Sequence, residues 1–92
     1  MLPDEAPEAA QEARRLAERA KAVAPELAEY SQEQIDRIVD RMAAAATACA
    51  EEFARLAVEE TGYGVVADKV QKNLFSSERV YRFIRPLKTV GV

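Results

Sequence analysis

The sequence has no histidine, no tryptophan and a single cysteine, Cys49, in 92 residues. The lack of histidine, with only one thiol, removes the common ligands of a zinc site, and one cysteine cannot form an intrachain disulfide. A reduced, cytoplasmic setting fits this composition. No run approaches the roughly 18 apolar residues of a membrane span, and residues 1–30 lack the apolar centre of a signal peptide. We therefore expect neither a disulfide-stabilised domain nor a membrane protein.

Large apolar side chains are also scarce. Apolar residues make up 49% of the chain, but 18 of them are alanine and only 21 are Leu, Ile, Val or Phe. A methyl group buries far less surface than a Leu or Phe side chain. A chain of this length forms one domain at most and buries only about 60–65% of its unfolded surface. The sequence therefore predicts a thin core that needs a further surface to pack against.

The charge is unevenly distributed. The net charge is −3, but residues 1–60 carry 14 acidic and 7 basic side chains, whereas residues 61–92 carry 2 acidic and 6 basic ones. The acidic total argues against nucleic-acid binding, which depends on basic surface to displace counterions from phosphates. The basic end could contact an anionic ligand or an acidic partner surface, or it could form a solvated face.

The first of three helical patterns runs from Pro7 to Ala24. Asp4 is expected to cap its start, and Pro25 to end it because proline disfavours a helical residue before it. Only Pro25 to Tyr30 separate this helix from the next, so packing on the second helix is favoured over a detachable amphipathic peptide. Its apolar stripe consists of Ala13, Leu16, Ala17, Ala20 and Val23.

The second pattern begins at Ser31, which Gln34 follows at the spacing of a capping box. It ends at Gly62, the residue type that most easily adopts the left-handed conformation after a helix. The sequence thus predicts one helix of about 30 residues and roughly 45 Å. Its apolar stripe is Ile35, Ile38, Val39, Met42, Ala46, Cys49, Phe53 and Leu56.

The third pattern runs from Val66 to Ile84 and is either one helix or two, divided at Ser76-Ser77-Glu78. Pro86 closes it, and Gly62 and Gly64 allow the chain to reverse so that this helix packs against the second. The last four residues, Thr89-Val90-Gly91-Val92, are apolar and β-branched and predict the start of a strand.

Two sites that invite a chemical role also have an ordinary structural explanation. Gly62-Tyr63-Gly64 neither follows a strand nor shows the spacing of a dinucleotide loop, so a helix stop and turn is favoured over a phosphate cradle. Cys49 lies on the apolar stripe with no His, Lys or Arg one helical turn away, which favours a core residue over a nucleophile.

Arg79, Arg82 and Arg85 recur every three residues, and Lys88 follows. Guanidinium groups suit phosphate oxygens, so these side chains could contact CoA or a nucleotide. The alternatives are a solvated face or salt bridges to a neighbouring segment. We expect all three arginines to point outward, since burying an unpaired guanidinium costs several kcal/mol.

Asp68 and Lys72 are four residues apart on one helical face, so an ion pair of a few tenths of a kcal/mol is expected between them. Asn73 is expected to bond to a backbone group nearby. Neither expectation requires a catalytic role.

Taken in order, Glu59-Glu60-Thr61-Gly62, Asp68-Lys69-Val70, Lys72-Asn73 and Lys88-Thr89-Val90-Gly91-Val92 resemble the N-terminal part of CoA-acylating aldehyde dehydrogenases. The resemblance includes the aldehyde domain of bifunctional aldehyde/alcohol dehydrogenases and extends from about Ser31 to Val92. It implies a mostly α segment at the start of an α/β fold, with residues 1–92 as an N-terminal helical segment, a probable fragment, and no second domain.

The resemblance also implies the activity of the parent enzyme: an aldehyde, CoA and NAD would be converted reversibly to acyl-CoA and NADH. The nucleophilic cysteine and the cofactor contacts would come later than Val92. We therefore expect no catalytic, cofactor-binding or metal residue in this segment, and no activity or cofactor binding by the segment alone. Its partner would be the remainder of the fold, in a homo-oligomeric parent. The alternative is a free-standing helical protein-interaction module.

Overall fold

The structure is a computed structural model that describes residues 7–91. These residues are mostly helical, as expected, and the described range contains no β-strand. The chain divides into two compact units, Met1–Tyr30 and Ser31–Val92. No helix within the described range is long and apolar enough to cross a membrane.

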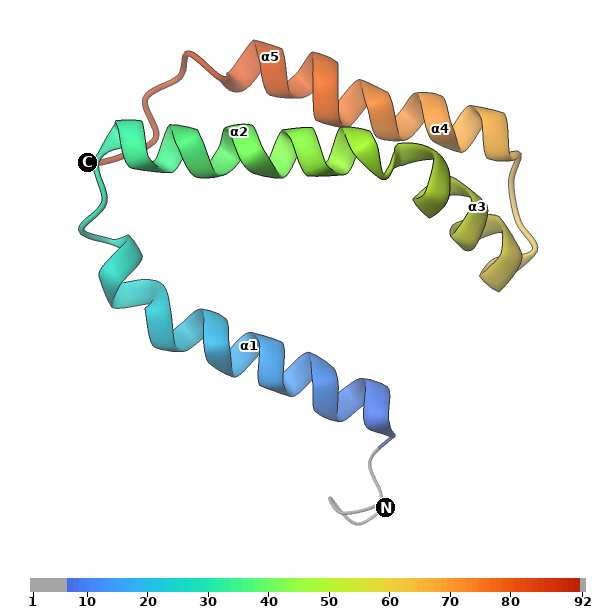
Figure 1. Cartoon of the computed structure of the whole chain (residues 1–92), viewed down its shortest axis with the longest axis horizontal. Coiled ribbons are helices and arrows are strands. Elements are labelled where there is room, and N and C mark those ends of the chain that lie inside the picture. Colours follow the sequence, from blue (N-terminus) through green and yellow to red (C-terminus); the bar gives the residue numbers. More distant parts are fainter. Residues whose placement is uncertain (1–6, 92) are drawn as a thin grey trace. The chain divides into compact units, whose positions relative to one another are not determined.

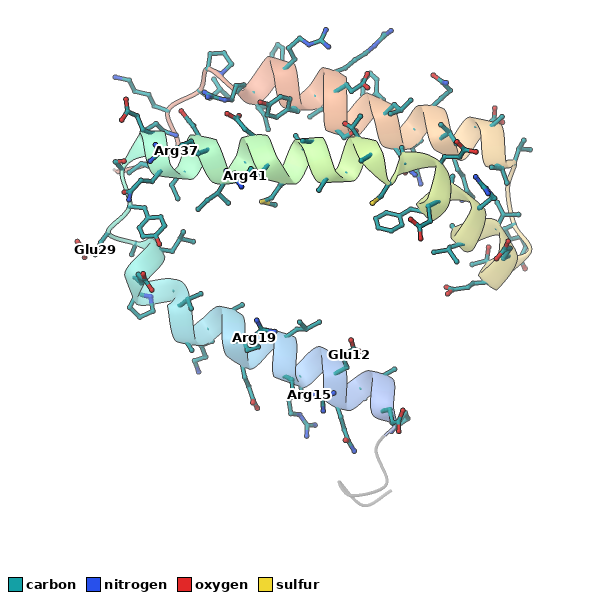
Figure 2. The ribbon with its side chains drawn as sticks, in the orientation of Figure 1. Glu12, Arg15, Arg19, Glu29, Arg37 and Arg41 are labelled. Carbon is teal, nitrogen blue, oxygen red and sulfur yellow. The ribbon has the colours of Figure 1, made fainter. Side chains whose placement is uncertain are left out.

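The first unit contains one amphipathic helix, α1, which spans Glu8–Leu27 (Figure 1). Its charged side chains include Glu12, Arg15 and Arg19, which Figure 2 shows along the helix. Leu16 and Val23 are more than half exposed. Because α1 is the one helix among residues 7–30, no other helix in that range covers its apolar stripe.

The expected end of this helix at Ala24 is wrong, because α1 continues through Pro25 to Leu27. Proline lacks an N–H group and removes one helical hydrogen bond, which is a large cost in a helix interior. Here Pro25 lies in the last turn, where few further bonds depend on it. The Ala28 N–H still donates to the Ala24 carbonyl at 3.0 Å. At the other end Pro7 occupies the cap position, and the expected cap Asp4 lies outside the described residues.

The second unit begins with α2, which spans Gln32–Ala48. The predicted capping box is confirmed. The Gln34 backbone N–H donates to the Ser31 hydroxyl at 3.2 Å, and the Ser31 N–H donates to the Gln34 side-chain oxygen at 2.9 Å. These two bonds satisfy backbone donors that have no partner within the helix. The start of α2 is therefore determined locally.

The prediction of one rod up to Gly62 is wrong. The helix breaks at Cys49, where φ is −97° and ψ is 4°, and a separate helix, α3, spans Ala50–Thr61. Figure 1 shows α3 turning away from the axis of α2. The turn brings Ala50 and Ala54 into the packed interior, where they are only 3% and 1% exposed. Small side chains on α3 permit this close approach, which an apolar stripe alone does not predict.

The third helical segment consists of α4 (Val66–Leu74), a π-helical turn η2 (Phe75–Val80) and α5 (Tyr81–Ile84). The division considered at Ser76-Ser77-Glu78 thus takes the form of a wider helical turn and not a break. Within it the Ser77 hydroxyl donates to the Asn73 carbonyl at 3.0 Å. Such a side-chain bond competes with the regular backbone bond and favours a local irregularity.

The expected packing of the third segment on the second is confirmed. α4 packs mainly on α3, and η2 packs on α2. The reversal between α3 and α4 uses Gly62 and Gly64, whose φ angles are +70° and +89°. Non-glycine residues rarely adopt such angles. Asn73 strengthens the contact, because its side-chain amide donates to the Ala50 carbonyl at 3.0 Å, as the sequence led us to expect.

The expected strand at the end of the chain is not observed in the described residues. Thr89 has no regular secondary structure and Val90 lies at a bend, whereas Val92 lies outside the described range. The backbone N–H groups of Thr89 and Val90 donate to the side chain of Gln32 and not to a neighbouring strand. The side chain of Gln32, 57 residues before Thr89, therefore holds the backbone of Thr89 and Val90 in this conformation.

Candidate functional site

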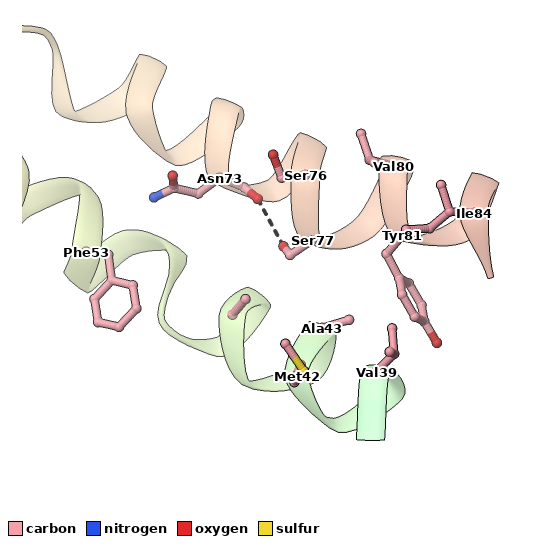
Figure 3. A pocket seen from close by; sticks show the side chains of 11 residues that line it. Val39, Met42, Ala43, Phe53, Asn73, Ser76, Ser77, Val80, Tyr81 and Ile84 are labelled. Atoms are coloured by element: carbon pink, nitrogen blue, oxygen red, sulfur yellow. Dashed lines mark hydrogen bonds between the residues drawn. The ribbon is translucent and has the colours of Figure 1, made fainter. Parts of the chain in front are cut away.

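An apolar groove of about 380 Å³ lies between α2 and α3 on one side and the η2–α5 segment on the other (Figure 3). Met42 and Phe53 contribute to the first wall, and Val80 and Ile84 to the second. The remaining side chains that line it are Val39, Ala43, Ala46, Asn73, Ser76, Ser77 and Tyr81.

The large apolar side chains of this groove are substantially open to solvent. Met42 is 64% exposed, Phe53 54%, Ile84 43% and Val80 39%. By contrast, Ala50 and Ala54 are the only buried apolar residues among those described. Burial of apolar surface is the main favourable term in folding. The most apolar surface of this unit is therefore available for something else to cover.

Three polar side chains beside the groove, Thr47, Asn73 and Ser77, form hydrogen bonds within the unit. The Thr47 hydroxyl donates to the Ser77 hydroxyl at 2.9 Å, and Ser77 in turn donates to the Asn73 carbonyl. Figure 3 shows the second of these bonds. Ser77 is buried, and pairing removes the cost of burying its hydroxyl. The groove thus offers a mainly apolar surface, and no buried side-chain polar atom among the described residues lacks a hydrogen-bond partner.

A second feature, which we call the carboxylate clamp, joins α2 to α5 through Asp36, Asp40, Tyr81 and Arg85. The Arg85 guanidinium donates to both oxygens of Asp40, from Nε at 2.6 Å and from Nη2 at 3.2 Å. Its Nη1 reaches Asp36 at 3.1 Å, and the Tyr81 hydroxyl donates to Asp40 at 2.5 Å. Such forked pairing suits the planar guanidinium.

The clamp shifts the titration of its members. Hydrogen bonds from Arg85, and then from Tyr81, hold the pKa of Asp40 below its ordinary value of 3.8. The hydrogen bond to Asp40 raises the pKa of Tyr81 above its ordinary value of 10.0. The hydrogen bonds that Arg85 itself donates to Asp40, together with the charge of Asp36, raise the pKa of Arg85. Around neutral pH the clamp therefore favours the charged forms of Asp40 and Arg85 and the neutral form of Tyr81.

The pH dependence follows from these directions. Because the pKa of Asp40 is lower in the folded than in the unfolded chain, its contribution to stability is present above pH 3.8 and is lost as the pH falls through the lowered pKa. The contribution of Tyr81 to stability depends on pH in the opposite direction. It is present below pH 10.0 and is lost as the pH rises through the raised pKa of Tyr81. The clamp therefore stabilises the unit across the neutral range.

We expect Arg85→Met to raise the midpoint at which Asp40 titrates, because the main donor to its carboxylate is removed. The carboxyl carbon of Asp40, followed by NMR between pH 2 and 6, reports this midpoint directly. Arg79→Met, which removes an exposed arginine from the same segment, serves as the control and should leave the midpoint unchanged. Equal midpoints in the native chain and in Arg85→Met would show that the clamp does not form in solution.

The structure separates the three arginines that the sequence groups together. Arg79 and Arg82 are exposed, as expected. The expectation for Arg85 is wrong, because it turns towards α2 and its side chain is 38% exposed in its ion pairs. The alternative of salt bridges to a neighbouring segment thus holds for Arg85. A neutralised guanidinium is not available as a phosphate contact.

The expected ion pair between Asp68 and Lys72 does not form among the described residues, where the ion pairs are Arg55–Glu51, Arg85–Asp36 and Arg85–Asp40. A pair worth a few tenths of a kcal/mol on an exposed helix face barely offsets the entropy of holding two side chains together. Gly62 ends α3 in the left-handed conformation, as predicted. Cys49 is half-buried at the junction of α2 and α3.

The apolar groove does not resemble a phosphate-binding site. The groove is apolar and has no basic side chain in its lining. Arg79 and Arg82 are exposed, while Arg85 is neutralised by two carboxylates. The two glycines after α3 serve the chain reversal. That this segment holds no cofactor contact stays a prediction.

Sequence reasoning missed Gln32, Asp36 and Asp40, which form the polar half of the contact with the last segment. A signal was present, since the three lie four residues apart and thus on one face of α2. That face lies beside the apolar stripe, and its partner Arg85 is 45 residues beyond Asp40. Periodicity identifies the face but not the distant partner.

Comparison with known proteins gives consistent results. No family model matches the chain. It is 44% identical over 77 residues, 84% of its length, to the bifunctional aldehyde-alcohol dehydrogenase AdhE of Escherichia coli K12. It is 43% identical over the same share of its length to the acetylating succinate-semialdehyde dehydrogenase of Clostridium kluyveri.

A solved structure of an acetylating aldehyde dehydrogenase from Geobacillus thermoglucosidasius aligns with 88% of this chain at 49% identity and a TM-score of 0.79. The chain spans only a small part of each relative: 9% of the E. coli protein, 17% of the Clostridium protein and 18% of the Geobacillus chain. Sequence and structure agree, and the helical arrangement described above is thus that of a segment homologous to acylating aldehyde dehydrogenases.

Proposed function

We propose that this chain is the N-terminal helical segment of an NAD-dependent, CoA-acylating aldehyde dehydrogenase. The parent enzyme would convert an aldehyde, CoA and NAD reversibly to acyl-CoA and NADH. In that enzyme NAD accepts the hydride and CoA accepts the acyl group. The segment itself supplies no catalytic group and contributes a structural layer.

The observation that carries the proposal is the combination of close homology with an uncovered apolar groove. At 49% identity and a TM-score of 0.79, the helices match those of an acetylating enzyme. Yet Met42, Phe53, Val80 and Ile84 remain largely exposed in the chain by itself. A segment that is one layer of a larger fold is expected to have such a surface, because a layer must bury its apolar face against another element.

We further propose that the partner of the groove is the remainder of the aldehyde dehydrogenase fold. The lining is mostly apolar and its buried side-chain polar atoms are already paired, so it fits apolar side chains better than a charged ligand. The clamp at Arg85 fixes the spacing of its two walls where α5 meets α2. A cytoplasmic homo-oligomer is the form that we expect for the parent.

A segment exchange tests this function. In the Geobacillus enzyme, the matching segment is replaced by residues Ser31–Val92 of this chain. Because the two are 49% identical, the exchanged enzyme should keep CoA-dependent NADH formation to within about tenfold, a loss of roughly 1.4 kcal/mol in transition-state stabilisation. Deletion of the segment should abolish the activity, because the helical layer would be missing.

The controls separate the proposed function from its alternative. An exchanged enzyme that is folded but inactive, or a deleted enzyme that keeps full activity, would contradict the proposal. If in addition the 92-residue chain alone folded cooperatively as a monomer, the alternative of a free-standing interaction module would be favoured. The chain alone should form no NADH from aldehydes, and activity that survives Cys49→Ala would reveal an active site within these residues.

A further inference from the structure

Gln32 occupies the first turn of α2, next to the end of the described chain. It is half-buried, and all four of its side-chain hydrogen bonds are formed within the second unit. Its Oε1 accepts the backbone N–H of Thr89 at 2.8 Å and that of Val90 at 2.9 Å. Its Nε2 donates to the Thr89 hydroxyl at 3.1 Å and to Asp36 at 2.9 Å. A single carboxamide thus uses its whole hydrogen-bonding capacity.

The orientation of this carboxamide is fixed by its neighbours. A flipped amide would direct Nε2 at the two backbone N–H groups and Oε1 at the Asp36 carboxylate, which gives three unfavourable contacts in place of favourable ones. Asp36 is held in turn by Arg85 at 3.1 Å. The carboxylate clamp therefore continues without interruption to the backbone of Thr89 and Val90.

Two consecutive backbone N–H groups that converge on one oxygen produce a bend, and Val90 lies at that bend. In a strand, successive N–H groups point to opposite sides, so one acceptor cannot serve both. The contact with Gln32 consequently explains why the β-branched end of the chain is not extended here. It also fixes the chain after Pro86 against the first turn of α2.

We propose that Gln32 is a positioning residue that sets the direction in which the chain leaves the helical unit. It acts by holding the Thr89–Val90 backbone at the N-terminal end of α2, with Asp36 and Arg85 holding Gln32 itself. The proposal concerns contacts within this chain and does not depend on the proposed function. A role in general stability would affect all of α2, whereas a positioning role affects the two amides that Gln32 binds.

Hydrogen–deuterium exchange of single amides in the 92-residue chain, at micromolar concentration, distinguishes these roles. Gln32→Met keeps the length of the side chain and removes all four bonds. It should accelerate exchange of the Thr89 and Val90 amides by about fivefold to tenfold, the range expected for hydrogen bonds of about 1 kcal/mol. The exchange rates of the Val39 and Met42 amides, in the middle of α2, should change by less than about twofold, because a local opening at Thr89 and Val90 does not expose them.

Gln34→Met is the matched control, because it removes a glutamine from the same turn and breaks the capping box instead. It should accelerate amides at the start of α2 and leave Thr89 and Val90 unchanged. If Gln32→Met unfolds the unit, the Thr89→Val variant is measured instead. This variant deletes only the hydroxyl contact and should still accelerate exchange of the Val90 amide relative to the Val39 amide. Unchanged Thr89 and Val90 exchange, or equal acceleration in both glutamine variants, would overturn the proposal.

Discussion

In isolation the 92-residue chain is expected to be strongly helical but to unfold over a broad temperature range, and to self-associate as its concentration rises. Only Ala50 and Ala54 are buried apolar residues among those described, and neither has a large side chain. Cooperative unfolding depends on a well-packed core, whereas exposed apolar patches drive association. The helices should persist because the capping box and the chain reversal are local.

Far-ultraviolet circular dichroism during heating, combined with sedimentation velocity at several concentrations, measures both effects. We expect a gradual loss of ellipticity and a sedimentation coefficient that increases with concentration. Met42→Gln, which replaces the most exposed side chain of the groove by a polar one of similar size, should reduce association without loss of helix. A sharp, concentration-independent transition in a monomer would mean that the unit needs no further partner.

Local signals in the sequence predicted the local features of the fold. Ser31 and Gln34 form the expected capping box, and Gly62 adopts the left-handed conformation that ends α3. Both depend on residues within one helical turn, where the chemistry of the cap is decisive. The apolar stripe likewise identified several members of the groove, including Val39, Met42 and Phe53.

Features that depend on distant residues were not predicted. The break at Cys49 serves the packing of Ala50 and Ala54 against α4, and no helix-breaking residue marks it. The bend at Val90 depends on Gln32, and the orientation of Arg85 on Asp36 and Asp40. The contacts of Gln32 and Arg85 span more than 40 residues of sequence, and a pattern of spacing contains no information about which distant side chain is the partner.

The resemblance to acylating aldehyde dehydrogenases came from ordered short motifs, and the comparisons support it. These motifs have mostly structural roles here. Gly62 ends a helix, and Asn73 joins α4 to the carbonyl of Ala50. Thr89 binds Gln32. The motifs that carry the resemblance thus include residues whose contacts in this chain are structural.

The central claim is that the rest of an aldehyde dehydrogenase covers the groove, and a charge placed in the groove tests it. In the isolated chain Val80 and Ile84 are 39% and 43% exposed. Val80→Asp with Ile84→Asp should therefore change the stability of the isolated chain by no more than about 1 kcal/mol, as is usual for surface positions. In the exchanged enzyme the same carboxylates would be buried without partners, which costs several kcal/mol for each.

The decisive measurement is CoA-dependent NADH formation by the exchanged enzyme with and without the two aspartates. We predict that they lower the activity by at least about a hundredfold, because more than about 3 kcal/mol of folding or assembly energy is lost. Arg79→Asp, on the same segment but at a position that already has an exposed charge, should leave the activity within about threefold of the unmodified exchange. Full activity with both aspartates present would show that the groove stays open in the enzyme, and would contradict the account.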